Sequence, residues 1–310
     1  MFIMSGIIML FGPEKLTLIL GILDLSLSTI SKIVTGCILA GYLVPGLAAP
    51  TPDIKVVCPN PLPKVPAALS RSDTYKDTPF KAGEVSEFAI SWMGMLAGYG
   101  TIEIQAPQKL DGIWHRAYHV EGRTGDWFKG IYVANDQASA LTRPWDWGVT
   151  KFYIEQQEGK FLGKSFNMKK WLDFAHDRCK VSEKAEQPGK PTQTVERDVQ
   201  YGAVDVIGAT LKLRTFNYVP GKSERFLVYT SEKNWFLEAT PLAVEDITVP
   251  AGNFKAMKLK LQTFIGKEMQ QKGDVYVWIA NEPQRTLVQV QGEIKIGSVY
   301  MRLSKYIPGR

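Results

Sequence analysis

Two pairs of side chains in this sequence have the types and spacing that metal binding or nucleophilic catalysis would use. His115 and His119 lie four residues apart. That spacing suits zinc on a helix, but the surrounding residues alternate as in a strand, which puts the two rings about 13 Å apart on one face. One zinc ion cannot join ligands at that distance. The sequence therefore predicts no metal site here.

His176 and Cys179 are the second pair, and a single helical turn would bring them together as a nucleophile and its base. The lysine-rich residues 167–172 precede them, and no third group that would orient the histidine is identifiable. The sequence also has no G-x-S-x-G motif, phosphate-binding loop or dinucleotide fingerprint. We therefore expect a protein that is not an enzyme, with no catalytic residues and no cofactor.

The three cysteines are Cys37, Cys58 and Cys179, and none forms a C-x-x-C pair. This excludes zinc ribbons and thioredoxin-type motifs. Cys37 lies in an N-terminal apolar region, and its removal would leave Cys58 and Cys179 as an even pair in an oxidising compartment. A disulfide between them is possible and would tie the N-terminal arm to the folded body.

The composition is that of a globular chain with a sizeable core, since 45% of its 310 residues are hydrophobic and 22% are charged. The net charge of +6 is spread along the sequence, which favours a solvated basic surface over contact with anionic lipid or a polyanion. Residues 164–171 come nearest to a basic stripe with aromatics. We expect no nucleic-acid partner, because the chain is predicted to be exported.

Residues 1–49 have the character of an export signal region. Lys32 supplies a positive start, residues 33–44 form a twelve-residue apolar core, and Pro45-Gly46 breaks the helix. Small residues follow, so we expect cleavage after Ala48 or Ala49, with the signal core at about residues 32–48.

Three alternatives to this simple signal remain. Translation could start near residue 30 at a codon other than Met. Residues 34–37 also fit a lipobox, which would make Cys37 a lipidated N-terminus, and an uncleaved anchor is the third alternative. Each of them exports the remainder of the chain, with membrane contact only through this N-terminal segment.

Residues 50–79 are predicted to be a proline-rich linker or arm. They act either as a tether between the membrane or cleavage site and the folded body, or as a poorly ordered terminus.

Residues 80–305 are predicted to form one β-rich domain. Apolar and polar residues alternate with period two, and Gly, Pro, Asn and Asp interrupt the pattern at short intervals, which indicates antiparallel strands. The clearest segments are residues 84–92, 100–106, 114–120, 149–156, 161–168, 225–230, 235–239, 245–249, 255–263 and 275–303. The last of these reads as a closing three-stranded meander. About a dozen such strands predict an all-β fold, a large curled antiparallel sheet in the form of a spiral roll or open half-barrel.

Helix is scarce in this pattern, which allows one or two short helices. The best segment is residues 205–214, where Asp205 can cap the first turn. Residues 182–195 are polar and are predicted to be an exposed loop.

Four aromatic side chains on turn-like segments are the candidate binding residues: Trp127, Phe128, Trp145 and Trp147. Tryptophan at a sheet rim can bind sugar rings, acyl chains or a partner. The alternative is that these rings plug the end of the roll.

Several short motifs in order resemble the bacterial family of unknown function DUF3108. They are residues 80–84, Ile90-Ser91-Trp92, Ala97-Gly98, Asp205, Leu213-Arg214, residues 249–254, Val277-Trp278-Ile279, Arg285 and Ile296-Gly297-Ser298. The resemblance implies an exported, envelope-associated protein of a Gram-negative bacterium, with no known activity. It also implies a β architecture similar to the periplasmic lipoprotein carriers of the Lol pathway.

Two functional hypotheses follow. The first is a non-enzymatic envelope protein that binds a lipid, an acyl chain or a lipoprotein on the concave face of the sheet. The second is a structural or assembly factor that binds another envelope protein through a sheet edge or an aromatic patch, without a ligand cavity.

The cleavage site is directly testable. The N-terminal peptide of the exported protein should begin at Ala49 or Pro50, because the small residues that signal peptidase requires end there. Mass spectrometry of the purified chain identifies this peptide. A chain that begins at a lipid-modified Cys37, or one that retains residues 32–48, would contradict the prediction.

Overall fold

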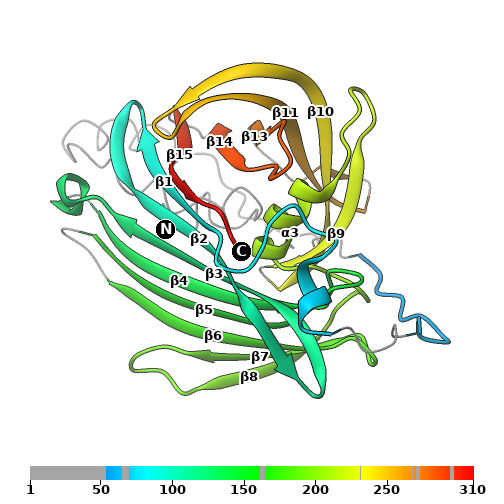
Figure 1. Ribbon diagram of the computed structural model, residues 1–310. Coiled ribbons are helices and arrows are strands. Elements are labelled where there is room, and N and C mark those ends of the chain that lie inside the picture. Colours follow the sequence, from blue (N-terminus) through cyan, green and yellow to red (C-terminus); the bar gives the residue numbers. More distant parts are fainter. Residues whose placement is uncertain are drawn as a thin grey trace, which may run out of the picture.

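The alternating segments of the sequence fold into the strands of one sheet in a computed structural model of the chain (Figure 1). The structure describes residues 54–64, 70–130, 132–160, 165–230, 232–266, 268–269, 273–293 and 297–310. The predicted export signal, including Ala48 and Ala49, lies outside the described residues. The predicted all-β class is confirmed, and α3 is the one α-helix among the described residues.

The strands, in chain order, are β1 (Val85–Trp92), β2 (Met95–Leu110), β3 (Ile113–Thr124), β4 (Tyr132–Thr142), β5 (Val149–Lys160), β6 (Phe166–Ala175), β7 (Lys180–Glu186), β8 (Gln193–Asp198), β9 (Glu224–Thr230), β10 (Lys233–Val249), β11 (Gly252–Ile265), β12 (Glu268–Met269), β13 (Val275–Ala280), β14 (Leu287–Glu293) and β15 (Ser298–Ile307). The helices are the 3-10 turns η3 (Ser72–Tyr75), η4 (Asp126–Gly130) and η5 (Leu213–Thr215), and the α-helix α3 (Val206–Lys212).

The first and last strands of the chain are neighbours in the sheet. The order is β8-β7-β6-β5-β4-β3-β2-β1-β15-β14-β13-β11-β10-β9, and β12 pairs with β11. The strand pairs are antiparallel, and β1 pairs with β15 from Val85↔Ile307 to Trp92↔Val299. The predicted closing meander is therefore present as β13, β14 and β15, and it joins the two halves of the sheet in its middle.

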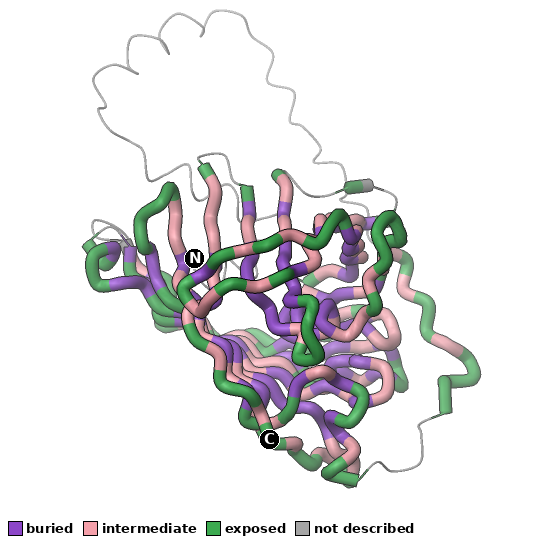
Figure 2. The backbone as a smooth tube through the Cα atoms, turned by 45° about the horizontal axis from the view of Figure 1, so that its top comes forward, coloured by how far each residue is buried: buried purple, intermediate pink, exposed green. Residues whose placement is uncertain are grey.

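The sheet curls until its two ends meet (Figure 1). The turn after β9 reaches the inner face of β6, β7 and β8, where Glu232 pairs with Lys170 at 3.2 Å and with Arg197 at 2.5 Å. Tyr229 of β9 donates a hydrogen bond to the buried Glu183 of β7. Buried and less buried residues alternate along most strands, so one face of each strand lines the interior (Figure 2).

The segment between β8 and β9 fills one end of this roll, which we call the helix end. Asp205 caps α3, and its side chain accepts hydrogen bonds from the amides of Ile207 and Gly208 at 2.7 and 3.0 Å. Residues 206–211 are buried. The predicted helix at residues 205–214 is therefore present, with its last turn continued as η5.

A buried ion pair locks the helix end to the start of the sheet. Arg214, directly after α3, contacts Glu84, directly before β1, at 2.6 Å, and both side chains are 2% exposed. The guanidinium also donates to the carbonyls of Gln284 and Arg285 and lies 4.8 Å from the ring centre of Phe80. Each charge is therefore neutralised in a site that water does not reach.

The prediction of a loop at residues 182–195 is wrong. Residues 180–186 and 193–198 form β7 and β8, joined by a turn at Pro188-Gly189. The polar composition hid the alternation, because the inward position at Glu183 is itself charged. Glu183 is buried only because Lys170 and Arg197 approach it at 3.0 and 3.4 Å.

The arm at residues 50–79 is attached to the body at two points. Cys58 and Cys179 form a disulfide with a Cα–Cα distance of 5.7 Å. Tyr75 is buried, and its hydroxyl accepts from the amide of Ala117 at 2.8 Å and donates to the carbonyl of Gln105 at 2.9 Å. Packing therefore begins before residue 80. The Tyr75 hydroxyl completes the backbone hydrogen bonding of β2 and β3 at the point where the register between these strands shifts.

The Arg214–Glu84 pair predicts a double-mutant result. Arg214→Met should lower the free energy of unfolding by about 3–5 kcal/mol, because it leaves the Glu84 carboxylate buried without its partner. Arg214→Met combined with Glu84→Gln should recover part of this loss. Urea denaturation of the single and double variants measures both values. A loss in the double variant equal to the sum of the losses in Arg214→Met and Glu84→Gln alone would show that the pair is not coupled.

The disulfide predicts a second loss of stability. Cys58→Ser should lower the free energy of unfolding by about 2–4 kcal/mol, because the bond closes a loop with a sequence separation of 121 residues. A reducing agent should lower the unfolding midpoint of the parent chain to that of the variant and leave the variant unchanged. A reductant effect of similar size on Cys58→Ser would contradict this.

Candidate functional site

The histidine pair of β3 is held by separate partners. His115 is buried, with Nδ1 at 3.0 Å from the carbonyl oxygen of Ile113, and burial lowers its pKa. His119 contacts the Ser139 hydroxyl at 2.9 Å and Glu121 at 3.1 Å. Both residues lie on a strand, as predicted, and the two rings bind different neighbours.

The His176–Cys179 pair has structural partners as well. The Cys179 sulfur is bonded to Cys58. His176 is buried, its Nε2 donates to the carbonyl of Val149 at 2.6 Å, and its Nδ1 accepts from the amide of Gly202 at 3.3 Å. Burial, followed by the charge of Arg143, lowers the pKa of His176 to about 4. The imidazole is therefore neutral at pH 7, and Cys179 has no thiol to activate.

The structure separates the four candidate aromatics into two pairs. Trp145 and Trp147 precede β5 at the helix end. Trp147 is buried, its ring stacks on Tyr118 with centroids 6.4 Å apart, and the Arg116 guanidinium lies 4.5 Å from its ring centre. Arg143 lies 5.6 Å from the ring centre of Trp145. Trp147 is therefore part of the packing that fills the helix end, and little of its surface can contact a ligand.

Trp127 and Phe128 lie in η4, at the opposite end of the strands. The Trp127 side chain is 64% exposed, whereas Phe128 is 2% exposed and packs edge-on against Trp92 with centroids 6.2 Å apart. The amide of Gly125 donates to the carbonyl of Ala97 at 2.9 Å, which holds η4 against β2. The packing of Phe128 and the Gly125–Ala97 hydrogen bond therefore hold η4 in place, with the Trp127 side chain exposed.

Other exposed apolar side chains lie at the same strand ends as Trp127. We call this group the apolar rim; it consists of Met93, Met95, Leu96, Trp127, Phe166 and Met269, each at least 37% exposed. Met93 follows β1, Met95 and Leu96 begin β2, and Trp127 lies between β3 and β4. Phe166 begins β6, and Met269 ends β12, the partner of β11. Exposed apolar groups gathered at one end of a fold mark an interaction surface.

Below the rim, the inner face of β2 to β5 consists mainly of small side chains. The register places Gly98, Thr124, Ala134 and Glu158 in the row nearest the rim. The next rows inward are Gly100, Gly122, Asp136 and Gln156, then Ile102, Val120, Ala138 and Ile154. Small residues at inward positions let neighbouring side chains approach the sheet closely, and a Cβ at Gly100 would lie 3.5 Å from Ile90 Cδ1.

The opposite wall of the interior is apolar. It is formed by β9, β10, β11 and β13, whose buried residues include Val228, Trp235, Leu237, Leu261 and Val277. These side chains belong to the same core cluster as Ala134, Ala138 and Ile154. This wall is therefore largely apolar, whereas β4 and β5 carry a polar band.

The polar band consists of Tyr132, Asp136, Gln156 and Glu158, all buried on the inner face of β4 and β5. Tyr132 donates a hydrogen bond to Glu158, and the Gln156 amide donates to the same carboxylate at 3.2 Å. Asp136 Oδ1 accepts from the amide of Gln157 at 3.0 Å, and no donor among the residues that the structure describes reaches its Oδ2. Burial, followed by the Glu158 charge, raises the pKa of Asp136 to about 7.

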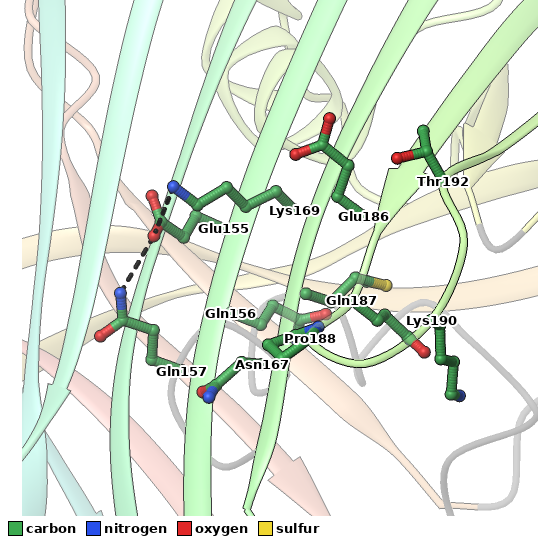
Figure 3. A pocket seen from close by; sticks show the side chains of 11 residues that line it. Glu155, Gln156, Gln157, Asn167, Lys169, Glu186, Gln187, Pro188, Lys190 and Thr192 are labelled. Carbon is green, nitrogen blue, oxygen red and sulfur yellow. Dashed lines mark hydrogen bonds and ion pairs between the residues drawn. The ribbon is translucent and has the colours of Figure 1, made fainter.

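A polar hollow lies beside the β7–β8 turn (Figure 3). It has a volume of about 670 Å³ and is lined by Glu155, Gln156, Gln157, Asn167, Met168, Lys169, Glu186, Gln187, Pro188, Lys190 and Thr192. Gln157 and Lys169 contact Glu155 at 3.0 and 3.4 Å. The lining is mostly polar and charged, so it suits a solvated surface better than an apolar ligand.

Among the described residues, no three His, Cys, Asp or Glu side chains are grouped so that they could hold a metal ion. Within the same part of the chain, no helix has both the length and the apolar character to span a membrane.

The family follows from the sequence match to this sheet. A family model described as a protein of unknown function, DUF3108, matches residues 87–304. The chain is a DUF3108 protein. The match runs from β1 to β15 and so covers the whole curled sheet, as the motif resemblance predicted. A comparison of this DUF3108 chain with curated proteins finds no match.

Solved structures with a similar fold include a β-barrel-like protein of the DUF1849 family from Brucella abortus. It is 7% identical to the DUF3108 chain, with a TM-score of 0.50, and the alignment covers 74% of this chain and 99% of that one. At this identity the likeness shows the fold alone.

Two further structures align less closely. One is a candidate exported protein with a YmcC-like fold from Bacteroides fragilis, with 11% identity and a TM-score of 0.33 over 74% of this chain and 98% of that one. The other is a candidate lipoprotein from Parabacteroides distasonis, with 12% identity and a TM-score of 0.31 over 74% and 98%.

Sequence reasoning did not identify the polar band of this DUF3108 chain. The sequence contained a sign of this band, because Asp136 and Glu158 occupy the same alternating positions as the inward apolar residues of their strands. In residues 132–142 every even-numbered position is buried, and Asp136 is one of them. An acidic residue at an inward position of a strand is therefore a feature that a search by parity would find.

The pKa of Asp136 predicts a pH-dependent stability. The folded chain holds this proton to about pH 7, and an unfolded chain releases it near pH 4. Stability from this group is thus fully present below about pH 4 and lost as the pH rises to about 7. Asp136→Asn should therefore be more stable than the parent at pH 8, by on the order of 1–3 kcal/mol.

Denaturation at pH 4 and pH 8 measures this difference. The gain should be present at pH 8 and should shrink at pH 4, where Asp136 is protonated in both states. An equal effect of the substitution at both pH values would contradict the assignment.

Proposed function

We propose that this DUF3108 chain is a non-enzymatic, exported protein of the bacterial cell envelope that binds a lipid, or the acyl chain of a lipoprotein, on the inner face of its curled sheet. The lining of that face is the observation that carries the proposal. At the rim end, β2, β3 and β4 present glycine, alanine and threonine inward, opposite a wall of large apolar side chains. Ligand sites for apolar molecules have such linings, with few polar groups.

The apolar rim supports the same function. Six exposed apolar side chains surround the strand ends beside the small-residue rows. A protein that takes up an acyl chain must first contact the membrane or the lipoprotein that holds it, and exposed methionine and tryptophan side chains adapt to such apolar surfaces. Of the predicted aromatics, Trp127 serves this role in the proposal, and the buried Phe128 packs beside it.

Export is supported by the Cys58–Cys179 disulfide, because such bonds persist in oxidising compartments. The signal-like segment that ends near Ala48 adds to this. We place the protein in the periplasm or envelope of a Gram-negative bacterium, with lipid or lipoprotein as its partner and no nucleic acid.

A second function has one specific observation in its favour. β8 is the last strand on its side of the sheet, and residues 193–196 are exposed. An envelope protein could add a strand to that edge, which would make the chain an assembly factor. Charged side chains of β8 such as Glu196, Arg197 and Asp198 disfavour pairing with an apolar strand.

Binding of a fluorescent fatty acid tests the first function. Purified protein without the export signal should bind the probe or carry co-purified lipid that native mass spectrometry detects. Ala134→Phe should reduce probe binding at least tenfold, because the ring would occupy the row nearest the rim. The adjacent Asn135→Phe, on the outward face of β4, is the matched control and should bind as the parent does.

Circular dichroism and thermal unfolding establish that both variants fold. Absence of bound lipid and of probe binding in the parent chain would reject the lipid function. Equal binding by the two phenylalanine variants would place the ligand elsewhere. Capture of an envelope protein that depends on β8 would then favour the assembly function.

A further inference from the structure

Two aromatic rings lie side by side on the outer face of β5 and β6. Tyr153 pairs with Trp171 across these strands, and their ring centres are 5.4 Å apart. The residues that follow them, Ile154 and Leu172, are buried on the inner face, whereas both rings are partly exposed. Two adjacent rings outside the core form a shared apolar surface on which a ligand ring can stack.

The polar hollow beside the β7–β8 turn begins next to these rings (Figure 3). Glu155, which lines the hollow, accepts a hydrogen bond from the Tyr153 hydroxyl at 2.8 Å. It also accepts from the Gln157 amide at 3.0 Å and contacts the Lys169 ammonium at 3.4 Å. Lys169 precedes Trp171 by two residues, so both lie on the same face of β6. The rings and the hollow are therefore neighbours, and Glu155 joins them.

The hollow lies where β7 leaves β6. Pairing between these strands ends at Lys169↔Glu186, whereas β6 remains paired with β5 to its first residue, Phe166. The β7–β8 turn then forms the far wall. The turn at Pro188-Gly189 is closed by a backbone hydrogen bond of 3.1 Å, with Gly189 at a φ of +74°, which is the geometry of a type II turn. The wall is therefore formed before any ligand binds.

The charges that line the hollow balance, since Glu155 and Glu186 face Lys169 and Lys190. The other polar lining groups are uncharged amides and one hydroxyl: Gln156, Gln157, Asn167, Gln187 and Thr192. Within the part of the chain that the structure describes, the side chains of Asn167, Gln187 and Thr192 make no hydrogen bond to another residue. Because an amide both donates and accepts, this lining matches a ligand with many hydroxyl groups and no net charge.

We propose that the hollow and the Tyr153–Trp171 pair together bind a neutral oligosaccharide. A sugar ring has an apolar face of C–H groups, which stacks on an aromatic ring, and an edge of hydroxyl groups, which amides and carboxylates bind. The volume of the hollow, about 670 Å³, lies within the ~300–1,000 Å³ of small-molecule sites. This inference goes beyond the lipid function and does not depend on it.

Other ligand classes fit this surface less well. A phosphate group favours a site with excess positive charge, and this lining has none. A peptide that adds a strand needs a free sheet edge, whereas β5, β6 and β7 are each paired on both sides. An apolar chain would leave the amides of the hollow without partners.

The face of the Trp171 ring is open to the outside. The Lys184 ammonium lies 4.9 Å from its ring centre, and the Lys184 side chain is 49% exposed. A stacked sugar ring displaces this ammonium at little cost, because its ion pair with Glu186 at 2.7 Å is exposed and such pairs contribute little.

Three neutral trisaccharides test the proposal: maltotriose, cellotriose and triacetylchitotriose. Calorimetric titration of the protein without its export signal gives their affinities, and tryptophan fluorescence reports contact with the ring. At least one of the three should bind with a millimolar dissociation constant and change the fluorescence. Glycerol, which has hydroxyl groups but no ring face to stack, should not bind at the same concentration.

Two variants and one control locate the site. Trp171→Ala should weaken trisaccharide binding about tenfold, because the stacking surface is lost. Asn167→Ala, at an exposed position, should weaken it about three- to tenfold through the loss of one hydrogen bond. Trp114→Ala is the matched control. This tryptophan is also partly exposed, with Lys109 at 5.8 Å from its ring centre, and lies outside the hollow. Its loss should leave the affinity unchanged.

Four results would overturn the saccharide site. They are failure of all three trisaccharides to bind the parent, binding of glycerol as tight as that of a trisaccharide, parent-like affinity in both Trp171→Ala and Asn167→Ala, and equal weakening in Trp114→Ala and Trp171→Ala. Circular dichroism establishes that each variant folds. The lipid function is tested separately by the fatty-acid probe, so neither result decides the other.

Discussion

Covering the inner face of one long sheet is the constraint on which the rest of this structure depends. Each strand alternates, so it has an apolar face that must leave water. A single sheet can bury that face by curling until its own two ends meet, which is what the approach of β9 to β6, β7 and β8 achieves. The pairing of β1 with β15 then makes the first and last strands of the chain neighbours in the middle of the sheet.

The two ends of the roll satisfy this constraint differently. At the helix end, α3 and Trp147 cover the inner face, and the Arg214–Glu84 pair fixes α3 to the first strand. At the rim end, the sheet presents small side chains and two carboxylates, surrounded by exposed apolar groups. This asymmetry is the observation on which we propose a ligand site at the rim end.

Much of the fold could be predicted from the sequence, because alternation and capping are local. Most of the strands, the closing meander and the Asp205-capped helix were evident, whereas β4 was not predicted. β7 and β8 were missed, since Glu183 occupies an inward position that only distant partners on β6, β8 and the β9–β10 turn make tolerable. The role of Tyr75 was also hidden, because its hydrogen bonds are made to strands 30 and 42 residues away.

The site was less predictable for the same reason. Trp127 and Trp147 read alike in the sequence, yet tertiary packing buries one and exposes the other. Which end of the roll a loop joins follows from strand order, and strand order is not local. The acidic residues Asp136 and Glu158 could be found by parity, but their proximity depends on the register between β4 and β5.

Photo-crosslinking tests the central claim most directly. A fatty acid with a diazirine along its chain, bound to the protein and irradiated, forms adducts that peptide mass spectrometry can place on the sequence. The account predicts adducts at inward positions of residues 97–104, 118–124 and 132–140, and on the facing strand at residues 235–239. Adducts confined to outward positions of these strands, or to the convex hollow beside the β7–β8 turn, would contradict it.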